Sequence, residues 1–177
     1  MSEGNWDYSL EDDEFFKGLP ELPETWAVFS RPESVAVDWH KTENQGRIGS
    51  CQGNDLASVL ERLAFVRGVK VQLSRIFAYL ATQKLDGLLG GDRGSTIAGG
   101  IKLAMEYGLP PETLTGYPSS YPGKSQRAKI LTQANYDAGA DYKPTSKWAV
   151  PIDHDEVLNF VGGGGGISYG CAYYGGM

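Results

Sequence analysis

The sequence predicts an α+β fold in which the helices come first and the strands come last. Apolar residues recur at helical spacing in three segments between positions 50 and 107, whereas residues 167–174 alternate between two sets of side chains. Helical spacing predicts amphipathic helices, and a period of two predicts a strand. Helices and strands that occupy separate stretches of the chain are typical of α+β domains rather than of alternating α/β domains.

The first two predicted helices cover residues 50–65 and 74–84. Each has a stripe of apolar side chains on one face, and each begins at a serine, Ser50 or Ser74. Serine is a favoured N-cap because its hydroxyl accepts a hydrogen bond from a free amide of the first turn.

The third predicted helix covers residues 95–107. Ser95 is expected to be its N-cap, and Gly108 stands where a glycine commonly follows the end of a helix. Shorter elements are predicted elsewhere: strands at 35–37 and 147–152, and helices at 126–133 and 156–161.

The charge is concentrated at one end of the chain. The 177 residues include 22 acidic and 16 basic ones, for a net charge of −6, and residues 1–26 hold eight of the acids with one lysine. Residues 1–26 are therefore predicted to be an acidic extension. The remainder has no basic stripe that could neutralise phosphates, so we expect no nucleic-acid partner.

Composition also argues against secretion, a membrane partner and metal chemistry. The N-terminus lacks a basic segment followed by an apolar run, and the longest uncharged stretch, residues 158–177, contains eight glycines. Cys51 and Cys171 are too few for a disulfide framework, and two cysteines with two histidines are few for a metal site. We therefore expect a cytoplasmic protein without a cofactor or a metal.

A cysteine stands at the predicted start of the first helix. Residues 44–51 read Asn-Gln-Gly-Arg-Ile-Gly-Ser-Cys, so Cys51 follows a glycine-bearing loop. Amides at a helix N-terminus stabilise an anion such as a thiolate. Gln45 can fold back beside the sulfur and, with the backbone N–H of Cys51, donate to an oxyanion on an attacked carbonyl. A small buried cysteine is the alternative interpretation of this residue on its own.

These residues resemble a motif of the papain/cathepsin family of cysteine peptidases. The family pattern Asn-Gln-Gly-x-Cys-Gly-Ser-Cys-Trp is similar to residues 44–52, and the Val-Asp-Trp at 37–39 and the Leu-Ser at 73–74 also look like family segments. The resemblance implies that Cys51 is the nucleophile and that Gln45 belongs to the oxyanion hole.

The resemblance also implies an architecture and a set of substrate-binding residues. It predicts a papain-like, two-lobe domain over residues 27–177, with a helical lobe at about 27–115 and an incomplete β-rich lobe at about 116–177. Gly90-Gly91 is similar to the paired glycines along which the family aligns an extended substrate. The residues implied in substrate binding are Gly49, Gly90 and Gly91.

Three features depart from the family pattern. Ile48 replaces a disulfide cysteine, Gln52 replaces the tryptophan after the nucleophile, and Gly53-Asn54 replaces Ala-Phe. The first agrees with a reducing compartment, and the others alter the floor of the expected cleft. Divergent microbial and viral members tolerate such changes, so a virion location stays open beside the cytoplasm.

The general base is the missing part of the pattern, since a catalytic thiol needs one. Neither His40 nor His154 lies in the family's histidine motif. Three interpretations stay open. In the preferred one the chain is a fragment that stops before the catalytic histidine. In the second it is an inactive protein that binds extended peptides, and in the third His154 is the base of a shortened enzyme.

The sequence therefore predicts a cysteine-type endopeptidase that acts on a peptide or protein substrate. Cys51 is the expected nucleophile, Gln45 an oxyanion donor, and the base is expected beyond residue 177. The chain as it stands is expected to have little or no peptidase activity. The alternative is a catalytically inactive, papain-like protein with a peptide-binding or structural role.

Overall fold

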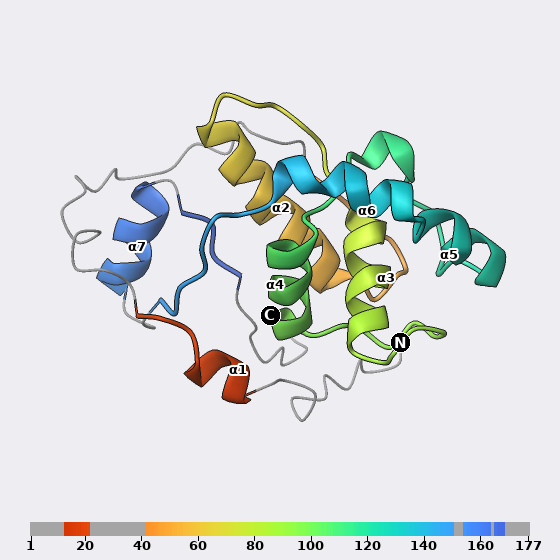
Figure 1. Ribbon diagram of the computed structural model, residues 1–177, viewed down its shortest axis with the longest axis horizontal. Helices are drawn as coiled ribbons and strands as arrows, with labels where there is room; N and C mark the ends of the chain where they lie inside the picture. Colours follow the sequence, from red (N-terminus) through yellow and green to blue (C-terminus); the bar gives the residue numbers. More distant parts are fainter. Residues whose placement is uncertain (1–12, 22–41, 151–153, 164, 169–177) are drawn as a thin grey trace.

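Helices form most of the regular structure in the part of the chain that is described. The computed structural model describes residues 13–21, 42–150, 154–163 and 165–168 (Figure 1). Their helices are, in order, α1 (Asp13–Lys17), α2 (Cys51–Val66), α3 (Arg75–Leu85), α4 (Ile97–Glu106), the 3₁₀ turn η3 (Glu112–Leu114), α5 (Lys124–Ile130), α6 (Gln133–Gly139), the 3₁₀ turn η4 (Ala140–Tyr142) and α7 (His154–Gly162). None of these helices is both long and apolar enough to cross a bilayer.

Helices α2, α3 and α4 form the core, and α3 packs against both of the others (Figure 1). Residues 73–83 are all buried, which agrees with an α3 sequence that carries apolar and aromatic side chains around most of its circumference. Helices α2 and α3 approach closely at Gly53, where an added Cβ would lie 2.7 Å from the carbonyl oxygen of Arg75. The core residues include Leu56, Leu60, Leu73, Ile76, Phe77, Tyr79, Leu80, Leu103 and Leu109.

The first two predicted helices are confirmed, with one difference at their caps. The Ser74 hydroxyl accepts a hydrogen bond of 3.0 Å from the backbone N–H of Phe77, as an N-cap should. Ser50 precedes α2 as predicted, but its side chain makes no capping bond to the helix. Its hydroxyl instead lies 2.7 Å from the hydroxyl of Tyr117.

The third predicted helix is also present, but its N-cap is Thr96 and not Ser95. The Thr96 hydroxyl accepts from the backbone N–H of Gly99 at 2.9 Å. The Ser95 hydroxyl donates to the side chain of Gln52 in α2, which removes it from capping. Gly108 follows the helix with a φ of 72°, as the sequence predicts.

The later helices are more numerous than predicted. Residues 126–133 were expected to form one helix, whereas the structure has α5 and then α6. The break falls at Thr132, whose side chain caps α6 by accepting from the backbone N–H of Asn135. The predicted helix at 156–161 is confirmed as α7.

The predicted α+β fold class, with its β-rich lobe, is wrong for the residues that the structure describes. They contain no sheet, and their strand-like pairing is limited to two isolated bridges, Glu21 with Ala149 and Leu73 with Pro111. Among the described residues, the segment 147–150 pairs with another extended segment at Ala149 alone, and residues 167–168 are irregular. An alternating pattern becomes a strand only where other strands pair with it. The predicted strand at 35–37 and the remainder of those at 147–152 and 167–174 lie outside the described residues.

Candidate active site

Cys51 is the first residue of α2 and is a free, exposed cysteine. Partial burial of its sulfur raises the pKa of the thiol. The backbone N–H groups of Gln52 and Cys51 lower it, as expected at a helix start, and the charge of Asp55 raises it again. Burial outweighs the two amides, so the pKa of Cys51 lies above its ordinary value.

Gln45 lies in the loop that leads into α2, but its amide group is turned onto the loop itself. Its Nε2 donates to the carbonyl oxygen of Ile48 at 3.3 Å. The turn is closed by Asn44, whose Oδ1 accepts from the backbone N–H of Gly46 at 2.8 Å, and Gly46 has a φ of 62° that favours glycine. Gln45 and Cys51 therefore belong to one ordered loop, with the Gln45 amide bonded internally.

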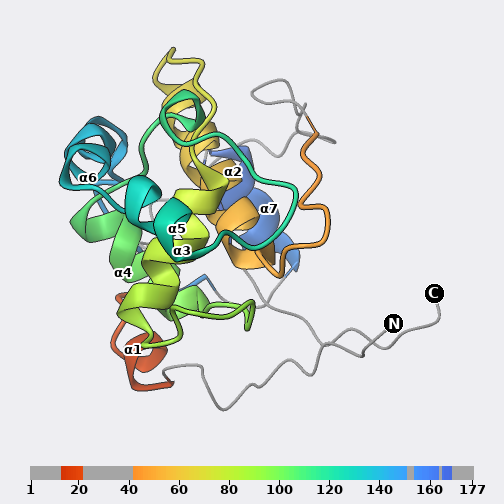
Figure 2. The ribbon, with the colours of Figure 1, turned by 90° about the vertical axis from the view of Figure 1, so that its right-hand side faces the viewer.

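Tyr117 ties this loop to a distant part of the chain. Its hydroxyl donates to the carbonyl oxygen of Gln45 at 3.0 Å and lies 2.7 Å from the hydroxyl of Ser50. Figure 2 shows the two loops side by side, with residues 42–50 in orange and residues 115–123 in green. One phenol thus contacts both ends of the segment between the predicted oxyanion donor and the predicted nucleophile.

A buried arginine, Arg75, connects the segment before this loop to the segment before Tyr117. The guanidinium of Arg75 forms a two-bond fork with Glu112, at 2.8 and 2.9 Å, and an ion pair of 2.9 Å with Glu43. It also lies 4.1 Å from the centre of the Tyr117 ring. Bidentate arginine–carboxylate pairs fix direction as well as charge, so Arg75 holds the segments around Glu43 and Tyr117 together.

The predicted substrate-binding glycines lie in a loop that is also held internally. Gly90 has a φ of 136°, which favours glycine, and its backbone N–H donates to the hydroxyl of Tyr121 at 3.2 Å. The carbonyl oxygen of Gly91 accepts from the Gln83 side chain at 2.9 Å and from the backbone N–H of Arg93 at 3.0 Å. That oxygen already has two donors, so this conformation leaves it poorly placed to accept from a substrate.

Gly49, the third glycine predicted to bind substrate, connects the two loops. Its backbone N–H donates to both carboxylate oxygens of Asp92, at 2.9 and 3.1 Å. The structure therefore brings Gly49 and the Gly90-Gly91 loop together through Asp92, a residue that sequence reasoning missed.

Asp55 is a second residue that sequence reasoning missed. It lies one helical turn after Cys51, and its carboxylate accepts a hydrogen bond from the Ser168 hydroxyl. Burial raises the pKa of Asp55, and the Ser168 bond lowers it by less. Spacing of four residues on a helix places two side chains on the same face, and that spacing was the available signal.

His154, the histidine that lies within the described residues, is not placed to act as a base for Cys51. His154 is exposed at the start of α7, and no hydrogen bond or ion pair among the described residues joins it to Cys51. His40 and Cys171 lie outside the described residues. No group of three or more potential metal ligands occurs within the described ranges.

Gln52, which was expected to change the floor of the cleft, points into the protein. It is 4% exposed, and its Oε1 accepts from the Ser95 hydroxyl at 2.9 Å. It packs at Gly100 of α4, where an added Cβ would overlap its amide. This polar side chain therefore links α2 to α4.

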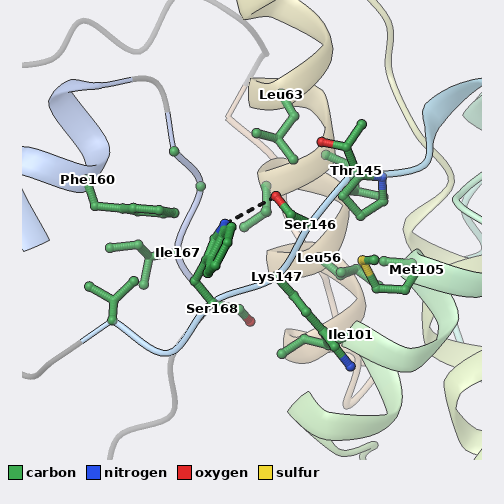
Figure 3. Close-up of a pocket in the computed structure, with 18 of the residues that line it drawn as sticks. Leu56, Leu63, Ile101, Met105, Thr145, Ser146, Lys147, Phe160, Ile167 and Ser168 are labelled. Carbon is green, nitrogen blue, oxygen red and sulfur yellow. Dashed lines mark hydrogen bonds between the residues drawn. The ribbon is translucent and has the colours of Figure 1, made fainter. Parts of the chain in front are cut away.

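An apolar groove of about 880 Å³ runs along the part of α2 farther from Cys51. Figure 3 shows Leu56 and Leu63 of α2, Ile101 and Met105 of α4, and Phe160 of α7 facing it. The residues of the other wall come from segments without regular structure: Pro144, Thr145, Ser146, Lys147, Trp148, Val150, Gly165, Gly166, Ile167 and Ser168. Among the described residues, none that lines the groove is acidic.

Comparison with known proteins gives a structural match. The chain superposes on xylellain, a cysteine protease from Xylella fastidiosa, with a TM-score of 0.71 and 25% sequence identity. The described helices have a papain-like fold. The match covers 84% of this chain and 59% of xylellain, so the chain spans less than two thirds of that protein's length. No family model and no curated protein matches the sequence.

Proposed function

We propose that this chain carries the nucleophile and the oxyanion donors of a cysteine-type endopeptidase. The observation that supports it most is Cys51, a free, exposed cysteine at the start of α2 whose sulfur faces the backbone N–H groups of Gln52 and Cys51. The fold shared with a cysteine protease supports the same chemistry. The expected substrate is the backbone of a peptide or protein.

The proposed reaction begins with attack of the Cys51 thiolate on a peptide carbonyl carbon. A C–S bond forms, and the carbonyl oxygen becomes an oxyanion held by the Cys51 backbone N–H and the Gln45 side chain. The C–N bond then breaks, and the amine leaves with the proton that the Cys51 thiol gave up to the base. Water hydrolyses the thioester, which releases the carboxylic acid and restores the thiol. The Gln45 amide must first leave the carbonyl oxygen of Ile48, to which it is bonded at 3.3 Å. No described residue is assigned as the base.

A second candidate is a protein that binds extended peptides without cleaving them. Partial burial and the charge of Asp55 both raise the pKa of Cys51, so the neutral thiol predominates at neutral pH. A neutral thiol is a weak nucleophile. This observation favours binding without turnover wherever no base is supplied.

Labelling with a peptidyl epoxide tests the proposal. We expect selective alkylation of Cys51 over Cys171, located by peptide mass spectrometry, and none at position 51 in Cys51→Ala. The same preparation is then assayed against a mixture of unstructured peptides. Slow, equal labelling of both cysteines without cleavage would contradict the peptidase proposal. Peptide complexes that persist in Cys51→Ala would then support the binding protein.

The Gln45→Ala variant tests the oxyanion assignment. Loss of one oxyanion donor lowers kcat by about 10² to 10³, and we expect that range with little change in KM. Gln133→Ala is the matched control, because Gln133 lies exposed on α6 and bonds only to Asp137 among the described contacts. A kcat for Gln45→Ala equal to that of the control would remove Gln45 from the site.

A further inference from the structure

We propose that Asp92 is a positioning residue that fixes the distance between the cysteine loop (residues 45–51) and the glycine loop (residues 87–94). The inference rests on the proposed function, because it assigns a purpose to the alignment of these loops. It concerns a carboxylate that neither the sequence motif nor the proposed chemistry uses.

The Asp92 carboxylate bridges two elements that are far apart in the sequence. On one side both of its oxygens accept from the backbone N–H of Gly49, at 2.9 and 3.1 Å. On the other side Oδ1 accepts from the hydroxyl of Tyr79 at 2.6 Å. Gly49 lies two residues before Cys51, and Tyr79 is a fully buried residue of α3. Asp92 therefore anchors the cysteine loop to the rigid core.

Tyr79 continues the connection into the glycine loop. Its hydroxyl accepts from the backbone N–H of Gly94 at 3.1 Å and from the side chain of Gln83 at 3.0 Å. Burial and the Asp92 carboxylate both push the pKa of Tyr79 far above its usual value, so the hydroxyl keeps its proton and remains a donor to Asp92.

Gln83 completes the set of bonds around the glycine loop. The two hydrogens of its Nε2 are shared among the Tyr79 hydroxyl and the carbonyl oxygens of Gly91 and Gly94, the last two at 2.9 and 3.0 Å, and its Oε1 accepts from the Tyr121 hydroxyl at 2.8 Å. Gln83 is fully buried. A buried network in which the members satisfy one another is rigid and holds a single geometry.

Rigidity between these two loops matters for the proposed reaction. In that reaction a substrate carbonyl must reach Cys51 while the peptide lies along the glycine loop, on groups other than the Gly91 carbonyl oxygen, which already has two donors. A misplacement of about 1 Å in such an arrangement can lower the rate about 10²-fold. Because Asp92 holds Gly49 directly, its loss should displace the cysteine loop relative to the glycine loop without removing a reacting group.

Amide hydrogen exchange tests the connection without any need for turnover. In the wild-type chain we expect the Gly49 amide to be protected. Asp92→Ala should speed its exchange and that of the glycine loop, while Asp92→Asn, which keeps an acceptor oxygen, should largely preserve protection. Asp137→Ala on α6 is the control. Unchanged exchange at Gly49 in Asp92→Ala would overturn the proposal.

Kinetics with the same variants test the purpose of the connection. We expect Asp92→Ala to lower kcat for a peptide about 10- to 100-fold. Alkylation of Cys51 by iodoacetamide, which does not use the glycine loop, should stay close to the wild-type rate. A parallel fall in both rates would contradict a positioning role, since it would show that the thiol itself had changed. If the wild type neither cleaves peptide nor is alkylated selectively at Cys51, the proposed function fails, and the exchange result alone decides whether Asp92 holds the loops.

Discussion

The two ends of α2 are held in different ways. Around its first turn, loops from three parts of the chain are joined by directional bonds through Arg75, Tyr117 and Asp92, at distances of 2.6 to 3.1 Å. Along its later turns, α2 faces an apolar groove of about 880 Å³ whose walls come from α4, α7 and two irregular segments (Figure 3). We call these the bonded end and the groove end.

The difference shows which part of the molecule is held in one geometry. Hydrogen bonds and ion pairs fix angles as well as distances, so the bonded end holds one arrangement of Cys51 and its neighbours. Apolar contact is non-directional and roughly proportional to buried area. The groove end can therefore change its packing with smaller losses, and substitutions should separate the two regions.

The largest expected effect is at Gly53, where α2 meets α3 beside the bonded end. A Cβ there would lie 2.7 Å from the Arg75 carbonyl oxygen and 2.8 Å from the Tyr79 nitrogen, and these backbone atoms cannot move aside easily. Gly53→Val should lower the free energy of unfolding by more than about 3 kcal/mol. Gly123→Val is the control, since nothing lies within 4 Å of a Cβ at that position. Urea denaturation that gave equal values would contradict the close helix contact.

Arg75 provides the next largest test of the bonded end. Arg75→Met removes the partner of two partly buried carboxylates, Glu43 and Glu112. We expect a loss of about 2–3 kcal/mol in the free energy of unfolding. Lys17→Met breaks the exposed Lys17–Glu14 pair of 3.3 Å and should change the free energy of unfolding by less than about 0.5 kcal/mol. Losses of similar size in the two variants would mean that the Arg75 cluster stabilises no more than a surface pair.

Two leucine truncations compare the core with the groove end directly. Leu80 is fully buried in α3, and Leu80→Ala should lower the free energy of unfolding by about 3 kcal/mol, because it leaves a cavity. Leu63 lines the groove and is only partly buried, so Leu63→Ala should lower it by about 1 kcal/mol. Equal losses would show that the groove end is packed as tightly as the core, and the comparison would fail.

The helical part of this fold was predictable because its signals are local. Helical spacing and the Ser74 cap gave α3, and the expected positions of α2, α4 and α7 agree with the structure. Thr96 rather than Ser95 caps α4 because the Ser95 hydroxyl bonds to Gln52 in another helix, and no local sequence pattern contains such a tertiary contact. The β-rich lobe was wrong because period two describes one segment, whereas a sheet requires a pairing partner.

The candidate site shows the same division. Cys51 and the loop bearing Gln45 were found from a contiguous motif, and their roles remain predictions. Asp92 and Tyr117 were not found, since each reaches the cysteine loop across more than 40 positions of sequence. The sequence also could not predict that the Gln45 amide points toward Ile48, because a side-chain rotamer depends on its neighbours in space.

The smallest expected effect is at Asp55, which connects the two ends of α2 through its bond with Ser168. The pKa of Asp55 is raised in the folded protein, so its contribution to stability is fully present below the unfolded pKa and is lost as pH rises through the folded pKa. Asparagine has no charge to bury and still accepts from Ser168. Asp55→Asn should therefore raise the free energy of unfolding at pH 7 by less than about 1 kcal/mol, and leave it unchanged at pH 3.

The same variant should shift the reactivity of Cys51. The charge of Asp55 raises the pKa of the thiol, so Asp55→Asn should move the midpoint of its alkylation by iodoacetamide to lower pH. Asp137→Asn on α6 is the control for both measurements. An unchanged alkylation midpoint together with lower stability at pH 7 would show that Asp55 acts through its bond with Ser168 rather than through its charge. In that case the groove end would influence the Cys51 thiol by packing alone.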